Sequence, residues 1–405
     1  MLPTNPDVLI IGAGAAGISA ARECVARGLG CVVLEAGPRI GGRCHTTHAL
    51  GAPLDLGATW LHAAARNPLT ALATDTIDHD TVRERHLWLG DRWAQEPELA
   101  ALEAAEQAFH DALDAAAAGP DRAVASVIPH GGPWDATVAH WEGAQIQARE
   151  VTELSLHDQL ANGLEGPNLL PRQGIGTLLL GLAAGLPIRL GAAVDRLDWS
   201  GPGVVAHGAF GRLEAPVAII TVSTGVLAAG GIDFTPALPA SHQQAIHDLP
   251  MGLLTKIGFN ATDRLGIPPF HGVRRRVTAD RPRPMSWVMW PFDQDMLFGF
   301  MGGAMAWELA AAGGAACEAA ARAEFASIFG PGHLGRAVVS DWGENPLFRG
   351  AYSQARPGAA GARAALAEPL GPLRFAGEAT HRGLAGTVGG AWLEGARTVR
   401  SVAGS

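Results

Sequence analysis

The chain has 405 residues, of which 48% are hydrophobic and 17% are charged, and its formal net charge is -9. This length and composition predict a soluble globular protein with a large core and two domains. The negative charge, without any block of basic residues, argues against a nucleic acid partner and favours cationic or neutral ligands.

Two features bear on location. The longest uncharged stretch, Ala215 to Ile232, contains a proline and three glycines, so we expect a buried strand and a turn there and no membrane contact. The first residues show no secretory signal, and the four cysteines form no CxxC pair, which is typical of reduced thiols in a cytoplasmic protein and not of a disulfide framework or a metal site.

The basic residues are 29 arginines and a single lysine, Lys256, and the chain has a single tyrosine, Tyr352. Such a composition, rich in Gly, Ala and Arg, suggests a bacterial protein from a GC-rich genome that replaces Lys by Arg wherever either serves. A lysine that survives is a candidate for a position where a guanidinium fails, because the pKa of a buried amine moves readily. Chance survival is the alternative.

The first predicted unit is a strand at Asp7 to Ile11, a glycine turn, a helix from Ile18 to Arg27 and a second strand at Cys31 to Leu34 that ends at Glu35. This is the βαβ context of a dinucleotide site, in which Gly12 and Gly14 allow close approach of a diphosphate and Gly17 lets the helix pack on the strand. Glu35 is predicted to accept hydrogen bonds from ribose hydroxyls.

The segment that follows, Ala36 to Arg43, ends in Gly41, Gly42 and Arg43. Here the chain resembles the flavin-containing amine oxidases, in which a GGR stretch lies along FAD. An arginine fork beside glycines can also approach a diphosphate on physical grounds alone. The next block, Asp55 to His62, resembles the flavin-facing segment of polyamine and spermine oxidases, which implies that Trp60 lines the substrate cavity and His62 contacts the amine.

Further along the chain, apolar spacing predicts an amphipathic helix between Glu96 and Ala118 and a second helical stretch from about Ala144 to Leu164. Short β-type segments follow, at Ile188 to Leu190, Val194 to Trp199, Val204 to His207 and Val217 to Val222. The segment Leu249 to Ile257 resembles a central block of the family, and this resemblance implies that Lys256 holds a water beside the flavin.

The C-terminal part begins with a predicted helix from Ala315 to Phe329 and ends with a strand, Leu373 to Ala376, and a helix from Gly386 to Arg400. Glu378 is predicted to accept from sugar or ribityl hydroxyls, and the helix N-terminus at Gly386 to stabilise negative charge on reduced flavin. By resemblance, Tyr352 forms an aromatic wall of the amine cage.

The resemblance implies further FAD contacts from the same blocks: Ala15, Ala16, Ala36, Gly57, Ala58, Thr59, Val194, Trp342, Gly377, Thr387 and Val388. Ala351 stands where monoamine oxidases have the cysteine that tethers FAD, so non-covalent FAD is expected. Thr387 replaces the second cage tyrosine, as in spermine oxidases.

The predicted fold class is α/β with an α+β substrate part. A Rossmann-type FAD-binding domain is expected from residues 1–75, 170–232 and 335–405, and a substrate-binding domain from residues 76–169 and 233–334, with a helical insertion at about 80–165.

The resemblance implies oxidation of a small-molecule amine, preferably a polyamine, to imine and aldehyde, with O2 reduced to H2O2. Two alternatives remain. One is an L-amino-acid or monoamine oxidase, and the other is a flavoprotein without oxidase activity, either a desaturase or a binding scaffold. The sequence does not indicate the oligomeric state.

Overall fold

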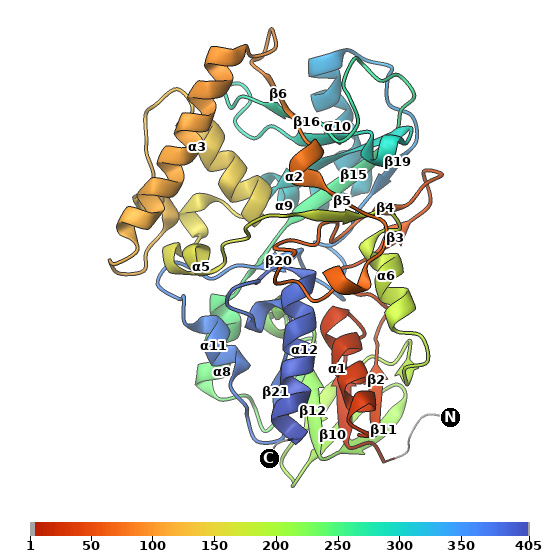
Figure 1. The fold of residues 1–405 in the computed structure, drawn as a ribbon. Coiled ribbons are helices and arrows are strands. Elements are labelled where there is room, and N and C mark those ends of the chain that lie inside the picture. Colours follow the sequence, from red (N-terminus) through yellow and green to blue (C-terminus); the bar gives the residue numbers. More distant parts are fainter. Residues whose placement is uncertain (1–4, 404–405) are drawn as a thin grey trace.

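The computed structural model describes residues 5–403, so the parts of the predicted domains at residues 1–4 and 404–405 lie outside the described residues. Two main sheets occupy different halves of the molecule (Figure 1). Helix α12 packs against α1, so segments from both ends of the sequence lie in the same half (Figure 1).

One half contains a five-stranded parallel sheet. Its strands, in the order in which they pair, are β21 (Leu373–Phe375), β12 (Val217–Ile220), β1 (Val8–Ile11), β2 (Cys31–Leu34) and β8 (Ile188–Arg189). All residues of β1 and β2 are buried, as expected for a parallel sheet covered on both faces. Helices α1 and α12 pack against each other on one face of this sheet (Figure 1).

The other half contains a six-stranded sheet in which β16 and β6 are parallel and the other pairs are antiparallel. Its order is β19 (Ala337–Val339), β15 (Leu254–Asn260), β18 (Met296–Gly302), β17 (Ser286–Met289), β16 (Gly272–Arg275) and β6 (Arg85–Trp88). The largest hydrophobic cluster lies against this sheet and includes the fully buried Trp287 and Trp290.

Four smaller sheets complete the strand pairing of the described residues. One has the order β11 (Gly211–Ala215), β10 (Val204–Gly208), β9 (Arg196–Asp198) and β13 (Asp233–Thr235). The two-stranded sheets are β14 (Met251–Gly252) with β20 (Tyr352–Ser353), β3 (Thr46–Thr47) with β4 (Leu54–Asp55), and β5 (Thr76–Asp78) with β7 (Leu169–Pro171).

The α-helices of the described residues are α1 (Ala15–Ala26), α2 (His79–Val82), α3 (Glu96–Ala116), α4 (Asp135–His140), α5 (Leu156–Ala161), α6 (Ile175–Leu182), α7 (Thr224–Ala228), α8 (Ala240–Asp248), α9 (Gly303–Ala311), α10 (Gly314–Phe329), α11 (Ala362–Ala367) and α12 (Val388–Ala403). A π-helix, η3 (Trp141–Gln147), continues α4. The 3-10 helices are η1 (Thr70–Leu72), η2 (Val124–Ser126), η4 (Val151–Glu153), η5 (Pro291–Asp293) and η6 (Glu378–Thr380).

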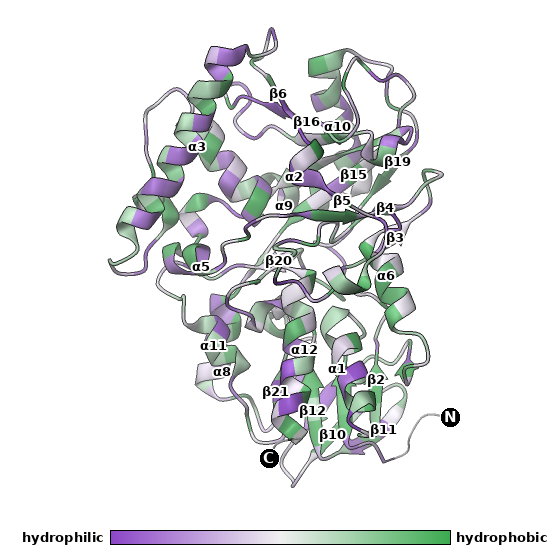
Figure 2. Cartoon of the chain, in the orientation of Figure 1, coloured by the Kyte–Doolittle hydropathy of each residue, from purple (hydrophilic) through white to green (hydrophobic). Residues whose placement is uncertain are grey.

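Helix α3 forms as the amphipathic pattern predicts. A capping box between Gln95 and Glu98 satisfies backbone donors at its N-terminus, where a proline occupies the first turn. Leu102, Phe109 and Leu113 are its buried residues, and Figure 2 shows hydrophilic residues interspersed with hydrophobic ones along the helix. The apolar face of α3 therefore packs into a hydrophobic cluster of the helical region.

The second predicted helical stretch, from about Ala144 to Leu164, is not one helix. The π-helix ends at Gln147, Ala148 has a positive φ of 57°, and a 3-10 turn separates it from α5. The Ala148 carbonyl accepts a hydrogen bond from the Leu253 backbone N–H at 3.1 Å. Pairing with the segment that leads into β15 thus bends the chain out of the helix.

The fold is the predicted one, a Rossmann-type domain with a second, mixed domain, but two strands cross the predicted boundaries. Strand β13 pairs with β9, and β19 pairs with β15 in the six-stranded sheet. The exact boundaries stay a prediction. No helix within residues 5–403 has the length and apolar character that a membrane crossing needs.

Candidate active site and cofactor cleft

The turn between β1 and α1 has the geometry that the glycine pattern predicts. Gly12 has a φ of 102°, and a Cβ on Gly17 would lie 1.9 Å from the Gly12 carbonyl oxygen, so only glycine fits there. Gly14 caps α1 without a side-chain acceptor, and the first turn holds no acid. The N-terminal amides of α1, at Ala15 and Ala16, therefore face an edge suited to an anion.

Glu35, at the end of β2, and the GGR segment after it both contact the β1 to α1 turn. The Glu35 carboxylate accepts hydrogen bonds from the backbone N–H groups of Ala13, in the turn, and of Gly37, the residue after Ala36, both at 2.7 Å. Gly14 forms a bridge with Gly41, and a Cβ on Gly42 would lie 3.2 Å from the Gly14 Cα. The backbone of both segments is thus held in close contact beside Arg43.

These residues fit the diphosphate of a dinucleotide such as FAD. The donor set consists of helix amides and a guanidinium, a Cβ added at Gly14 would meet only the Gly42 Cα within 4 Å, and the turn, or glycine cradle, lies at the carboxyl end of β1. FAD would be held by Gly12, Gly14, Gly17 and the Gly42 to Arg43 segment.

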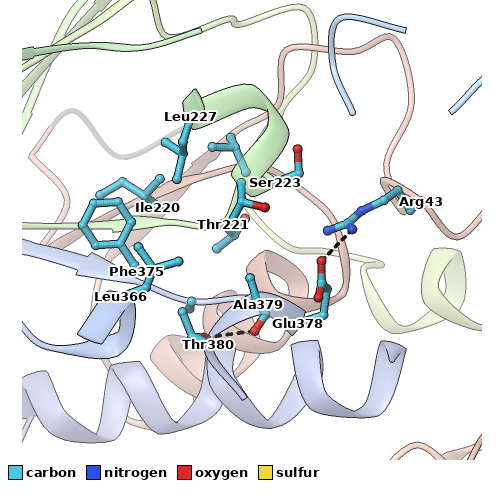
Figure 3. A pocket seen from close by; sticks show the side chains of 14 residues that line it. Arg43, Ile220, Thr221, Ser223, Leu227, Leu366, Phe375, Glu378, Ala379 and Thr380 are labelled. Atoms are coloured by element: carbon cyan, nitrogen blue, oxygen red, sulfur yellow. Dashed lines mark hydrogen bonds and ion pairs between the residues drawn. The ribbon is translucent and has the colours of Figure 1, made fainter. Parts of the chain in front are cut away.

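A pocket continues this cleft at the carboxyl ends of β12 and β21 (Figure 3). The ion pair of Arg43 with Glu378, 2.9 Å between Nη1 and Oε1, lies at its edge. Its other lining residues are Ile220, Thr221, Val222, Ser223, Thr224, Leu227, Leu366, Phe375, Ala376, Gly377, Ala379 and Thr380. Ligands of open α/β sheets bind outside the carboxyl ends of the strands, which is where this pocket lies.

Each of five other predicted FAD contacts has a structural role of its own. The Gly386 N–H donates to Glu378 Oε2 at 3.1 Å. The Thr387 hydroxyl accepts from the Gly390 N–H at 3.0 Å, as an N-cap does, and Val388 is the first residue of α12. The Trp342 indole donates to the Leu56 carbonyl at 2.9 Å. A fifth, Val194, is buried in the hydrophobic cluster that covers the parallel sheet.

Lys256 lies on β15 with its side chain buried among neutral acceptors. Its Nζ donates to the carbonyl oxygens of Asp55, at 2.6 Å, and Gly57, at 3.0 Å, and to the Thr59 hydroxyl. Three acceptors match the three N–H bonds of an ammonium. Burial nevertheless lowers the pKa of Lys256 to about 7, against the opposing effect of the Asp55 carboxylate. The amine therefore exchanges its proton near neutral pH.

Aromatic rings surround this amine. The Nζ lies 5.0 Å from the ring centre of Phe298, 5.5 Å from that of Phe300 and 5.9 Å from that of Trp60. The Trp60 indole donates to His79 Nδ1 at 3.0 Å, and burial lowers the pKa of His79 to about 4, so His79 stays neutral and can accept. Ring faces attract a cation, so this wall suits an amine.

His62 stacks beside Trp60, with ring centres 6.1 Å apart. Its Nδ1 lies 2.7 Å from Asn168 Oδ1, while the Asn168 amide donates to Asp80 Oδ2 at 2.8 Å. Since the Asn168 oxygen can only accept, the proton of neutral His62 is on Nδ1, which leaves Nε2 as an acceptor. Burial lowers the pKa of His62 and favours this neutral form.

Tyr352 lies with the C-terminal motif. Its ring packs against Gly386, where an added Cβ would lie 3.3 Å from Cδ2, and its hydroxyl donates to the Ile146 carbonyl at 2.7 Å. Burial raises the pKa of Tyr352, so the hydroxyl stays protonated. Tyr352 pairs with Gly252, two residues before the start of β15, and β15 is the strand that carries Lys256.

The sequence interpretation missed the partners of the predicted residues. Phe298 and Phe300 are two positions apart on β18 and so share a face, and Phe300 lies opposite Lys256 in the pairing of β15 with β18. The alternation was visible in the sequence, but the register that sets it against Lys256 was not. His79, Asn168 and Ile146 carry no motif and are brought in by long-range folding.

Two protein families have sequence patterns that match this chain. The sequence pattern of the NAD(P)-binding Rossmann-like domain matches residues 10–75, and that of the flavin containing amine oxidoreductases matches residues 136–403. The chain belongs to the family of flavin-containing amine oxidoreductases. The cofactor class of this family is flavin, in agreement with the cleft.

Two relatives from Oryza sativa subsp. japonica illustrate the similarity. Polyamine oxidase 4 is 30% identical over 63% of this chain and 59% of its own length, so the match covers less than two thirds of that relative. Polyamine oxidase 1 is 28% identical over 98% of this chain and 97% of its own length.

Among solved structures, putrescine oxidase bound to putrescine is 19% identical, with a TM-score of 0.82 and 99% of each chain covered. Cyclohexylamine oxidase from Brevibacterium oxydans IH-35A is 22% identical, with a TM-score of 0.79, 98% of this chain and 99% of that chain covered. Both structures share the two-domain fold.

Proposed function

We propose that the protein is an FAD-dependent oxidase of small-molecule amines, with FAD bound non-covalently and O2 as the electron acceptor. The observation that carries the proposal is the buried Lys256 amine, which has a pKa of about 7, donates to the Gly57 carbonyl and faces the rings of Trp60, Phe298 and Phe300. Bound FAD would supply a two-electron acceptor for the amine and, once reduced, a reductant for O2.

The residues of the chain have separate roles in this proposal. Lys256 holds a water or a proton at its Nζ, because that amine changes its charge near neutral pH. His62 accepts a hydrogen bond from the substrate amine through Nε2, and Trp60 and Tyr352 orient the substrate by their ring faces. The aromatic wall also excludes bulk water. Ala351 offers no thiol for a covalent tether, which supports non-covalent FAD.

A polyamine is the proposed substrate class. The net charge of -9 favours polycations, and the similarity to plant polyamine oxidases and to putrescine oxidase supports the same class. Release of H2O2, measured across spermine, spermidine, their acetylated forms, monoamines and L-amino acids, tests this choice. Activity confined to L-amino acids or to monoamines would replace it by the corresponding alternative.

The substitution Lys256→Met tests the role of the amine, because methionine keeps the length and apolar stem of the side chain. We expect FAD to stay bound while its reduction by the amine slows by about a hundredfold or more, as for loss of a general acid–base group. His48→Gln, at an exposed position that carries no role in the proposal, is the control. Unchanged reduction in Lys256→Met would remove Lys256 from the proposed chemistry, and a wild-type flavin that no amine reduces would favour a flavoprotein without oxidase activity.

We also propose a cytoplasmic location in a bacterium. The support is the composition and the four cysteines, which are buried and unpaired among the described residues. Cell fractionation of the native host would test this location.

A further inference from the structure

A buried arginine outside the proposed active site has every donor occupied. Arg363, on α11, has a side chain that is 1% exposed. Its Nε and Nη2 donate to the two carboxylate oxygens of Asp158, at 2.7 and 2.8 Å. Its remaining N–H bonds reach Ser353 Oγ at 2.9 Å, the Ser353 carbonyl at 3.1 Å and the Ala379 carbonyl at 3.3 Å. Five donors thus meet five acceptors, which fixes the guanidinium in one orientation.

The Ser353 hydroxyl connects Arg363 to Glu378 by two hydrogen bonds. Since it accepts from Arg363, its own proton is free to donate to Glu378 Oε2, at 2.7 Å. Glu378 Oε2 also accepts from the Gly386 N–H, and Oε1 accepts from the Ser353 N–H at 3.1 Å and from Arg43 Nη1 at 2.9 Å. Four donors fill the acceptor sites of the carboxylate.

Arg43 is the last member of this chain of contacts and the more exposed partner of its ion pair with Glu378. Its side chain is 23% exposed, whereas that of Glu378 is 5% exposed. Nη1 is held by Glu378 and by the Ala351 carbonyl at 2.9 Å. Within residues 5–403 its Nε and Nη2 have no protein partner, so these donors are available to a ligand beside the glycine cradle.

We propose that Arg363 is a positioning residue for the cofactor: the line Asp158, Arg363, Ser353, Glu378 holds Arg43 in the orientation that binds the FAD diphosphate. The proposal rests on the FAD assignment made above. The charges alternate in sign along the line, and its far end, Asp158, lies on α5 in the helical region. Placement of that region is therefore linked to the affinity for FAD.

The test is a titration of the flavin-depleted full-length protein with FAD, followed by flavin fluorescence. The variant Ser353→Ala removes the hydroxyl that joins the two ion pairs and leaves both pairs in place. We expect its Kd for FAD to rise about tenfold, the size of effect typical of one hydrogen bond to a charged group. Ser353→Cys keeps the size of the side chain with a weaker donor, so its Kd should lie between those of wild type and Ser353→Ala.

Asp121→Asn is the matched control. Asp121 accepts from Ser155 Oγ at 2.8 Å and from the Ala360 N–H at 3.2 Å, so it also joins the α5 and α11 regions, but it does not contact Glu378. A merely structural effect would change both variants alike. We expect Asp121→Asn to lower Tm while its Kd for FAD stays within about twofold of wild type.

Two results would overturn the positioning role. One is wild-type affinity for FAD in Ser353→Ala and Ser353→Cys. The other is an equal loss of affinity in Asp121→Asn. A wild-type protein that takes up no FAD would instead contradict the cofactor assignment, and the positioning role with it.

Discussion

Two buried cations, Lys256 and Arg363, are accommodated in opposite ways. Arg363 has a carboxylate partner in Asp158, with two parallel hydrogen bonds. Lys256 has only carbonyl and hydroxyl acceptors within hydrogen-bond distance, and burial lowers its pKa to about 7. The carboxylate of Asp55 is directed elsewhere, to Thr46 and the N-terminus of α6. Arginine suits a permanent charge and lysine suits a switchable one, which explains why one lysine remains in an arginine-rich chain.

The largest expected effect is on the paired cation. Arg363→Met leaves the Asp158 carboxylate buried without its partner, so the free energy of unfolding should fall by about 3–5 kcal/mol. Urea denaturation measures it. The double variant Arg363→Met with Asp158→Leu removes both charges and should recover part of the loss. A single variant as stable as wild type would show that the ion pair contributes little.

Lys256, which has no carboxylate partner within hydrogen-bond distance, should make the free energy of unfolding depend on pH. The pKa of Lys256 is about 7 in the native protein and 10.5 in its ordinary state, so the unfolded chain holds an extra proton between these values. Wild-type stability should therefore gain, relative to Lys256→Met, up to about 4 kcal/mol as pH rises from 7 to 10, and nothing below pH 7. Urea denaturation of both proteins across this range checks it, and a difference that does not vary with pH would rule out the lowered pKa.

A smaller effect is expected where the cleft closes around the diphosphate. In Gly42→Ala the new Cβ would lie 3.2 Å from the Gly14 Cα at a φ of 57°, so FAD affinity should fall by about tenfold. Gly51→Ala is the control, because it has a φ of 90° with no atom within 4 Å of its Cβ. Fluorescence titration with FAD compares them, and equal affinities would remove the cradle from the account.

The smallest effect concerns the ring of Tyr352. Tyr352→Phe keeps the ring against Gly386 but loses the hydrogen bond to the Ile146 carbonyl, so the free energy of unfolding should fall by about 1 kcal/mol. Thermal denaturation measures this loss, and turnover with the preferred amine should change little because the ring remains. Loss of most turnover would assign the hydroxyl a chemical role.

The sequence predicted the parts of the site that depend on local pattern. The β1 to α1 turn follows from glycine spacing between a strand and a helix, and Lys256 stood out by composition and resemblance. What it could not predict depends on long-range register: Phe300 faces Lys256 only through the pairing of β15 with β18. The turn expected after β12 is the short helix α7, capped by the Ser223 hydroxyl, which accepts from the Val226 N–H.

In the proposed function an amine delivers electrons to FAD held between the glycine cradle and Lys256. The most direct measurement is the visible absorption spectrum of the FAD-loaded protein before and after anaerobic addition of spermine, followed by admission of air. We predict loss of the oxidised flavin band on addition of the amine and its return, with H2O2, in air. A protein that takes up no flavin, or a flavin band unchanged by every amine tried, would contradict the account.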